Sequence, residues 1–439
     1  MLMQEPLSPA DLGKRIGREV RLEGWVHDVR VLGGISFVLL RNARGIVQLA
    51  VPKKTVNPEV YATVSGLRQE DVISCLGEVK ESKAARQGFE VVPRSVEVLA
   101  RSAAPLPLDP RGVTPAALDT RLEWRSLELR RPETTAVFNI ENALVQGFEE
   151  YLQGSGFIRV FTPSIIGGVS EGGSEVFKID YYGREAFLRQ DPQLHRQLTI
   201  AGGFDRIYDL GTNWRAELSH TPRHLSEHRT VAPEMGFIAD ERDVMRVEEE
   251  MLVHGIEKAV KRCPNELAIL KRELSLPKTP FPEIDFPEVY GILQSKGKEL
   301  PRGEDLDEES KDLLAAYARE KFGADFFFVS RFPSKPKPFY IMRYDDDPEF
   351  ARSTDFFFGS LELSSGGQRE HRHEKIMAQI REKGMDAKSL AWFTEPFRYG
   401  VPPHGGFSFG IERFTARLLG IENVKEAVLF PRDPERLQP

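Results

Sequence analysis

Residues 212–238 read TNWRAELSHTPRHLSEHRTVAPEMGFI and predict a strand, a polar loop and a second strand that extends to Ile238. Arg215 and Glu217 are two residues apart, so a continuous first strand would display both side chains on one face. The loop adds Arg223 and His224. Because the planar guanidinium of arginine binds phosphate through two parallel hydrogen bonds, this hairpin is typical of a site for a phosphate-bearing ligand. Hairpins of this composition also occur as solvated sheet faces, where ion pairs contribute little.

A second segment, residues 406–413 with the sequence GFSFGIER, predicts a strand that leads into a helix carrying Arg413. The two segments together resemble motifs 2 and 3 of the class II aminoacyl-tRNA synthetases, which read FRAE…RHL…E and GxGxER. Gly410, Glu412 and Arg413 match the second motif, whereas Ser408 stands where the family often has glycine. The sequence contains no GxxxxGK[ST] phosphate loop, so the resemblance implies that arginines of these two motifs hold ATP.

The composition is that of an ordinary globular protein with two or three domains. The chain has 439 residues, of which 40% are hydrophobic and 29% charged, and its net charge is −7. No apolar run approaches the ~20 residues that span a bilayer, and the N-terminal segment lacks the apolar core of a signal peptide. Cys75 and Cys263 have no metal-ligand spacing, which favours two buried thiols in a reducing cytoplasm.

Residues 1–102 predict a five-stranded barrel with one helix near residues 58–67. The segment GWVHDVRVLGGISFVLLRNARGIVQLAV resembles the OB-fold domain with which aspartyl-type members of the family bind the tRNA anticodon. That resemblance implies anticodon contacts from Arg30, Phe37 and Gln48. Phe37 offers a ring for base stacking, although a phenylalanine in the barrel core would give the same pattern. The predicted strands are residues 19–29, 35–42, 46–52, 72–81 and 89–99.

Residues 103–131 begin as a proline-rich linker and predict a hinge between this domain and a catalytic domain at residues 132–439. An amphipathic helix at residues 132–154, followed by GFIRVFTPSII, resembles motif 1, which implies a homodimer. Further helices are predicted at residues 243–261 and 310–322. The predicted fold class is therefore α+β, with a five-stranded OB-fold barrel followed by a class II synthetase domain built on an antiparallel sheet flanked by helices.

Two segments resemble the amino-acid site of the family. The glycine-rich stretch VSEGGSE is typical of a loop that closes over a substrate, and Glu171 matches the glutamate of the family's substrate lid. The stretch QDPQLHRQ resembles the aspartyl-type signature QSPQLYKQ. Gln193 matches this signature, whereas Asp191, His195 and Arg196 depart from it.

A third segment, STDFFFGSLELSSGGQR, resembles the strand that supplies a metal carboxylate and a substrate-binding arginine. Strand alternation predicts Leu361 and Leu363 on one face and Glu362 and Ser364 on the other. The resemblance assigns Mg²⁺ to Glu362 and Ser365, since this hard cation prefers oxygen ligands, with Asp355 as an outer ligand. Arg369 matches the arginine that pairs with the substrate side chain.

The resemblance implies an ATP-dependent synthetase that activates L-aspartate as its adenylate and transfers the aspartyl group to tRNA. The catalysis then consists of positioning and charge stabilisation, for which the catalytic residues are Arg215, Glu217 and Arg413. The implied ATP-binding residues are Arg215, Ala216, Glu217, Arg223, His224, Leu225, Glu362, Gly410, Ile411, Glu412 and Arg413. The implied substrate-binding residues are Glu171, Gln193, Arg196, Arg215, Ser365 and Arg369.

Three positions of the amino-acid site differ from the family pattern. Ala232 stands where an aspartate usually holds the α-ammonium group, Arg196 replaces a lysine and Asp191 replaces a serine. Three interpretations remain open. The protein is an aspartyl-type synthetase with a rearranged ammonium site, a synthetase for another carboxylic acid or acyl acceptor, or a tRNA-binding protein without catalysis. The intact Arg215, Glu217, Glu362 and Arg413 argue against the third.

Overall fold

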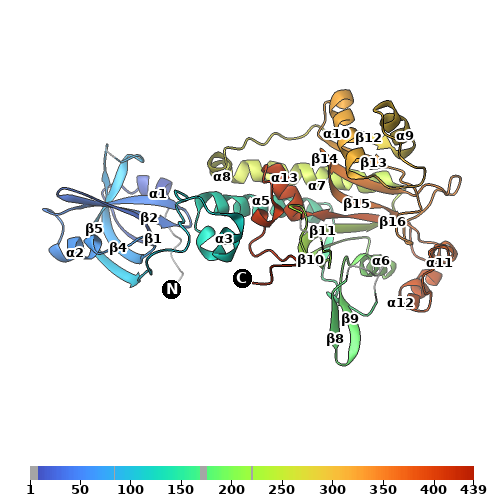
Figure 1. Cartoon of the computed structure of the whole chain (residues 1–439), viewed down its shortest axis with the longest axis horizontal. Helices are drawn as coiled ribbons and strands as arrows, with labels where there is room; N and C mark the ends of the chain where they lie inside the picture. The colour runs from blue at the N-terminus through green and yellow to red at the C-terminus, as the bar shows by residue number, and fades with distance from the viewer. Residues whose placement is uncertain (1–7, 84, 169–175, 219–220) are drawn as a thin grey trace. The chain divides into compact units, whose positions relative to one another are not determined.

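The computed structural model describes residues 8–83, 85–168, 176–218 and 221–439, and the chain divides into two compact units, Met1–Pro132 and Glu133–Pro439 (Figure 1). Among the described residues, no helix combines the length and the apolar character that crossing a bilayer requires. Cys75 and Cys263 are free and buried, as the sequence predicts.

The first unit contains a closed barrel with the strand order β1-β2-β3-β5-β4. Alternate strand residues fill its interior, and Val26, Val38, Leu49 and Val91 are fully buried. The predicted five strands and the helix near residues 58–67 are confirmed with small differences at some ends, and a short helix at Pro9–Gly13 that was not predicted precedes them. The elements are α1 (Pro9–Gly13), β1 (Glu19–Leu32), β2 (Ile35–Asn42), β3 (Gly45–Pro52), α2 (Pro58–Ser65), β4 (Val72–Glu81) and β5 (Phe89–Ala100).

The predicted hinge region falls within the first unit. It contains two short helices, α3 (Leu118–Glu123) and α4 (Arg125–Glu128). Just beyond them, the Arg130 guanidinium lies 2.8 Å from the Glu70 carboxylate, which also pairs at 2.7 Å with Arg41. These ion pairs attach the end of the segment to the barrel.

The second unit is organised on an eight-stranded sheet with the order β12-β13-β14-β15-β16-β11-β10-β6. The six central strands are antiparallel, as predicted, whereas β12 pairs with β13 and β6 with β10 in parallel. The sheet is therefore mixed at both edges. Its strands are β6 (Ile158–Val160), β10 (Arg206–Trp214), β11 (Glu227–Gly236), β12 (Glu283–Asp285), β13 (Phe326–Ser330), β14 (Ser353–Phe358), β15 (Leu361–Arg369) and β16 (His404–Gly410).

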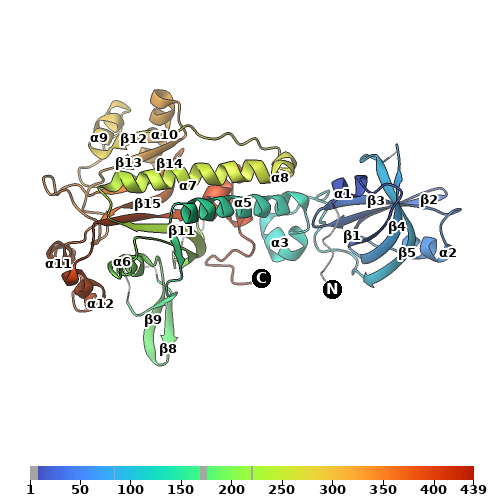
Figure 2. The same cartoon turned by 180° about the vertical axis from the view of Figure 1, so that it is seen from behind.

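Two long helices, α5 (Pro132–Gly154) and α7 (Glu241–Arg262), lie side by side along this sheet (Figure 2). Their close approach depends on two glycines, because a Cβ on Gly147 would lie 2.7 Å from the Cα of Gly255. Phe148 of α5 packs edge-on against Phe409 of β16 in the sheet, with ring centroids 5.6 Å apart. This packing fixes β16, which contains the first half of the segment 406–413 and leads directly into the helix that carries Arg413.

The remaining elements of the second unit surround this sheet. A small sheet with the order β7-β9-β8 stands beside it, and the predicted helix at residues 310–322 is present as α10. The elements are β7 (Ile165–Ile166), β8 (Lys178–Tyr181), β9 (Arg184–Leu188), α6 (Gln193–Ala201), α8 (Pro264–Ile269), α9 (Phe286–Ser295), α10 (Glu308–Phe322), α11 (His373–Glu382), α12 (Ala391–Thr394), η1 (Glu395–Tyr399), α13 (Ile411–Leu418) and η2 (Val424–Ala427).

Candidate active site

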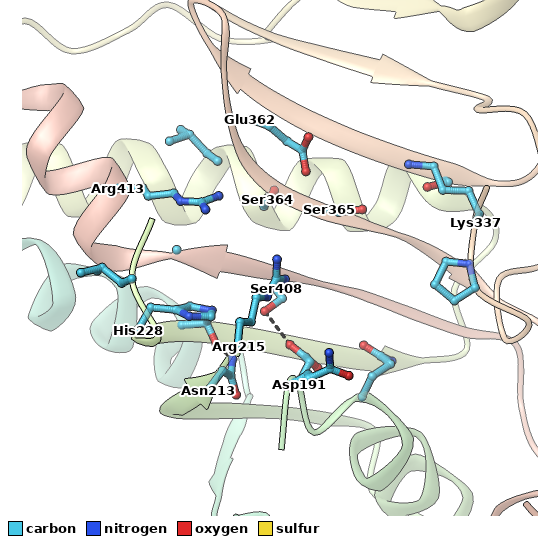
Figure 3. A pocket seen from close by; sticks show the side chains of 18 of the residues that line it. Asp191, Asn213, Arg215, His228, Lys337, Glu362, Ser364, Ser365, Ser408 and Arg413 are labelled. Atoms are coloured by element: carbon cyan, nitrogen blue, oxygen red, sulfur yellow. Dashed lines mark hydrogen bonds between the residues drawn. The ribbon is translucent and has the colours of Figure 1, made fainter. Parts of the chain in front are cut away.

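A cavity of about 410 Å³ brings the two motifs and the amino-acid segments together (Figure 3). Its walls come from β10, β11, β15, β16, the start of α6 and α13, together with the segment around Lys337. Of the predicted site residues, those that line it are Gln193, Arg215, Glu217, Arg223, Leu225, Glu362, Ser365, Arg369, Gly410, Glu412 and Arg413. Ala216, His224, Ile411 and Arg196 are not among its lining residues, and Glu171 lies outside the described residues.

The hairpin differs from its prediction at both strand ends. Strand β10 ends at Trp214, which pairs with Glu227, so Arg215 and Glu217 follow the strand and do not share a face of it. The backbone N–H of Arg215 still donates to the Ser226 carbonyl at 3.0 Å, which keeps this residue beside the sheet. The Arg215 side chain is 48% exposed and lies 3.5 Å from the Glu217 carboxylate.

Strand β11 ends at Gly236, so the prediction of a strand that continues to Ile238 is wrong. Phe237 has a φ of 58° and is exposed. A positive φ is incompatible with an extended strand, which explains why the ladder stops there.

Glu412 joins the two motifs. Its carboxylate is buried and accepts the backbone N–H of Arg229 at 3.0 Å from both oxygens, and it also accepts the Arg229 guanidinium at 3.0 Å. The neighbouring Arg413 donates from Nε to the backbone carbonyl of Arg223 at 3.3 Å. Helix α13 and the motif 2 loop are therefore held together, which places the guanidinium groups of Arg215 and Arg413 on one cavity.

His228 lines the same cavity as these arginines, and nothing in the sequence pattern predicted it as a site residue. Burial, followed by the positive charges of Arg215 and Arg413, lowers the pKa of His228 to about 3. The ring is therefore neutral near pH 7 and adds a flat, uncharged surface to the cavity (Figure 3). It follows the first residue of β11, and its position in the sequence gave no signal that the ring would face inward.

A bulge in β15 changes the predicted alternation. Phe356 pairs with Ser364 but Phe357 pairs with Glu362, so Leu363 is an extra residue. Glu362, Ser364 and Ser365 all line the cavity, but the Ser364 hydroxyl donates to Glu248 of α7. The bulge thus allows two residues three positions apart to present oxygen atoms to one space.

These two oxygen donors fit a Mg²⁺ ion, which typically keeps several waters and takes one or two protein carboxylates plus substrate phosphates. The described residues contain no group of three or more His, Cys, Asp or Glu that could hold a metal by themselves. Lysines lie next to both acids of this region. The Lys311 ammonium is 3.4 Å from Glu362, and the Lys337 ammonium is 2.9 Å from Asp355.

The opposite part of the cavity is built on a buried polar network. Arg369 donates to Glu234 at 3.0 Å, to the Gln193 side chain at 2.9 Å and to the Gly406 carbonyl at 2.9 Å. Gly406 is required here, because a Cβ would lie 2.4 Å from the Glu234 carboxylate. Arg196 is fully buried behind the wall and donates to Asp191 at 2.8 Å and to Gln193 at 2.7 Å.

The three predicted anticodon residues lie on the outer side of the barrel in the first unit. Arg30 of β1 pairs directly with Phe37 of β2, and Gln48 of β3 pairs with the nearby Leu39. Phe37 is partly exposed, whereas its neighbours Ser36 and Val38 are fully buried. The ring therefore points out of the barrel core, which excludes the alternative of a core phenylalanine.

Fold and site together define a class II tRNA synthetase. The chain belongs to this family: residues 117–434 match the model of the class II tRNA synthetases (D, K and N), and residues 20–99 match the OB-fold nucleic acid binding domain. Family membership implies the use of ATP and of tRNA. The predicted OB-fold and class II synthetase domain are thereby confirmed.

The relatives of the chain narrow the class to aspartyl- and asparaginyl-type enzymes. The chain is 44% identical to an aspartate–tRNA(Asp) ligase of Pyrococcus horikoshii, with 96% of this chain and 97% of the relative covered. It is 45% identical to an aspartate–tRNA(Asp/Asn) ligase of Methanopyrus kandleri, with 97% of both chains covered. Among solved structures, asparaginyl-tRNA synthetase from Pyrococcus horikoshii complexed with asparaginyl-adenylate has a TM-score of 0.91 at 32% identity, with both chains covered completely.

Proposed function

We propose that the protein activates L-aspartate with ATP and transfers the aspartyl group to tRNA-Asp. The observation that carries this proposal is the shared cavity, which has the Arg215 and Arg413 guanidinium groups at one end and Arg369 at the other. The phosphates of ATP need cations at the first end, and the side-chain carboxylate of a dicarboxylic amino acid needs a cation at the second. Because the relatives include both aspartate–tRNA(Asp) and aspartate–tRNA(Asp/Asn) ligases, tRNA-Asn is the second acceptor to test.

The reaction has two steps, and neither needs a nucleophile from the protein. The substrate α-carboxylate attacks the α-phosphate of ATP and displaces pyrophosphate, which gives the aminoacyl-adenylate. A ribose hydroxyl of the tRNA then attacks the carbonyl carbon of the adenylate and displaces AMP. Arg215 stabilises the charge that develops on the α-phosphate, while Arg223 and Arg413 bind the outer phosphates. Glu217 orients Arg215, which lies 3.5 Å away. Glu362 and Ser365 would hold Mg²⁺, which neutralises phosphate charge when bound.

The amino-acid end binds the substrate side chain through Arg369. Two of its nitrogens are engaged with Glu234, Gln193 and Gly406. These contacts fix the guanidinium plane before the substrate arrives, so little side-chain entropy is lost on binding. A carboxylate gains more than an amide from a cation at this position, which favours aspartate over asparagine.

A second candidate is the activation of another carboxylic acid. It is favoured by one observation, the ion pair between Asp191 and Arg196. Because Asp191 neutralises Arg196, this arginine has less positive charge to offer to the side-chain carboxylate of aspartate. Amino-acid-dependent ATP–pyrophosphate exchange separates the two candidates. We expect exchange with L-aspartate to exceed that with L-asparagine, L-glutamate and succinate. Exchange with a different acid and none with L-aspartate would favour the second candidate.

Arg215→Ala tests the phosphate assignment. Removing a cation that acts on the transition state should lower kcat/KM for exchange by roughly 10²–10³-fold, while binding of tRNA is retained. Arg215→Lys keeps the charge without the planar fork and should recover only part of the rate. Exchange by Arg215→Ala at the unmodified rate would refute the assignment.

We also propose that Arg30, Phe37 and Gln48 bind the anticodon. Phe37→Ala should weaken tRNA binding by about 1–3 kcal/mol, the contribution typical of one stacked base. Leu99→Ala removes an exposed apolar side chain of β5, 49% accessible, and serves as the matched control. Exchange without tRNA should not change in either variant, and equal tRNA affinities in the two would contradict the assignment.

We propose a homodimer in the cytoplasm, the compartment in which tRNA is charged for translation. Strand β6 is an edge strand that exposes Ile158 at 54%, and Phe161 just beyond it is 83% exposed. Such apolar residues beside an open edge are typical of an interface between subunits. Light scattering coupled to gel filtration tests this proposal, and a mass of 49.7 kDa in solution would refute it.

A further inference from the structure

Asp191 is a carboxylate that faces the cavity and is fixed from two sides. One oxygen accepts the Arg196 guanidinium at 2.8 Å. The other accepts the Ser408 hydroxyl at 2.9 Å, as Figure 3 shows. The side chain keeps 17% of its surface exposed. Each carboxylate oxygen can accept a second hydrogen bond, so Asp191 retains acceptor capacity toward the cavity.

The neighbours of Asp191 form one row across the sheet. Ser408 of β16 pairs with Ser365 of β15. The register of β11 with β16 joins Val231 to Phe409 and Glu234 to Gly406, which places Ala232 opposite Ser408. Ala232 offers only a buried methyl group at this point. Position 232 of β11 therefore supplies no carboxylate to this row, and the cavity-lining carboxylate beside Ser408 is Asp191, which precedes α6.

Arg196 explains how the carboxylate is held there. Its side chain is fully buried and has carboxylates on two sides, Asp191 at 2.8 Å and Glu234 at 3.8 Å. Burial disfavours ionisation of Asp191, but Arg196 and the Ser408 hydroxyl outweigh this effect and lower the pKa of Asp191. The carboxylate stays charged near pH 7, and displacing the Arg196 guanidinium would remove the cation that pairs with Asp191.

The other carboxylates among the described lining residues have separate roles. Glu217 contacts Arg215 and His224, Glu362 contacts Lys311, and Glu412 contacts Arg229. Glu217 lies in the motif 2 loop, Glu362 in β15 and Glu412 in α13. At the start of α6, which carries Gln193, the lining carboxylate among the described residues is Asp191.

We propose that Asp191 binds the α-ammonium group of the amino-acid substrate and that Arg196 and Ser408 are its positioning residues. This inference rests on the proposed function and adds a specificity determinant to it. A substrate with carboxylates near Arg215 and Arg369 needs an anion for its ammonium group between them. An acid that lacks the ammonium group would bring negative charge near Asp191 without a positive charge of its own, so Asp191 also selects against such acids.

The test compares L-aspartate with succinate, which differs from it only by the missing ammonium group. For the full-length protein, KM for L-aspartate in pyrophosphate exchange and the inhibition constant of succinate are measured for Asp191→Asn and for the unmodified chain. We expect KM for L-aspartate to rise about 10- to 100-fold, the effect of one hydrogen bond to a charged group. The inhibition constant of succinate should stay level or fall, and KM for ATP should not change.

Two further variants guard against a loss of folding in Asp191→Asn. Ser408→Ala keeps the carboxylate but removes one of its supports, so KM for L-aspartate should rise less than in Asp191→Asn. The double variant Asp191→Ser with Ala232→Asp moves the carboxylate to β11 and should recover KM relative to Asp191→Ser alone. Asp312→Asn, on the exposed side of α10, is the control without effect.

The outcomes separate the inference from the proposed function. If the unmodified protein exchanges with L-aspartate but Asp191→Asn keeps its KM and its discrimination against succinate, the inference is overturned and the proposed function stands. If the unmodified protein does not exchange with L-aspartate, both are overturned. A parallel rise of the constants for L-aspartate, succinate and ATP would show a structural role only and would also overturn the inference.

Discussion

Glu412 and Arg229 form the contact that joins two segments 183 residues apart in the sequence. The buried carboxylate accepts the backbone N–H and the guanidinium of Arg229, each at 3.0 Å. Because it accepts a backbone donor of β11, Glu412 fixes the start of α13 against the sheet and not only against another side chain. Arg413, which we propose binds phosphate, is the next residue, so its position depends on this contact.

Glu412→Gln should therefore reduce both stability and nucleotide binding. The amide cannot accept from all the donors that surround the carboxylate, and we expect a loss of about 2 kcal/mol in the free energy of unfolding. KM for ATP in the exchange assay should rise, while KM for the amino acid changes less. Glu422→Gln, at an exposed position four residues beyond α13, is the control for urea denaturation. Equal midpoints for the two variants would contradict the role of Glu412.

His228 should remain neutral across the pH range in which the enzyme is assayed. Its pKa is lowered to about 3 by burial and by the charges of Arg215 and Arg413, so protonation lies far below pH 5. In Arg413→Met one like charge is removed and the pKa of His228 should rise. Nuclear magnetic resonance of ring-labelled histidine between pH 5 and 8 measures this. A His228 signal that titrates near pH 6.5 in the unmodified protein would be inconsistent with its environment.

Gly147→Ala should destabilise the pair of long helices. The added Cβ would lie 2.7 Å from the Gly255 Cα and 3.0 Å from the His254 carbonyl, and backbone atoms cannot move aside as a flexible side chain can. We expect a loss of about 1–3 kcal/mol. Gly154→Ala is the matched control, because it ends the same helix with nothing within 4 Å of the new Cβ. Thermal melts that rank the two variants equally would refute the packing argument.

Strand periodicity predicted the barrel, whereas the resemblance of several segments to the class II synthetases predicted the central sheet and many of the cavity-lining residues. The sequence patterns failed where backbone geometry changes within a strand. The segment around Arg215 alternates like a strand, but its hydrogen-bonded ladder ends at Trp214. The bulge at Leu363 is equally invisible to alternation, since an extra residue leaves no mark on composition.

The amino-acid end was the hardest part to predict. Asp191 and Arg196 were both recognised as unusual, but the sequence could not say which of them faces the cavity. The structure resolves this, because Arg196 is on the buried side of α6 and Asp191 precedes the helix. Lys337 and His228 gave no local signal, and only tertiary contacts bring them to the cavity.

The buried Glu248 should make stability depend on pH. This carboxyl group of α7 is 1% exposed and accepts the Ser364 hydroxyl, and burial raises its pKa to about 8 from the ordinary 4.5. The folded state therefore binds this proton more tightly than the unfolded state. The free energy of unfolding should fall as the pH rises from about 4.5 to about 8, because ionisation is opposed only in the folded protein.

Glu248→Gln removes this titration and keeps an acceptor for Ser364. At pH 5 the variant and the unmodified protein should have similar stability, whereas at pH 8 the variant should be more stable by on the order of 2–4 kcal/mol. Urea denaturation at both pH values measures the difference. Glu273→Gln, at an exposed position, should be neutral at both. A variant that loses stability equally at pH 5 and pH 8 would mean that Glu248 is ionised in the folded state at both pH values. The surrounding helix and strand would then stabilise the carboxylate, which would contradict its raised pKa.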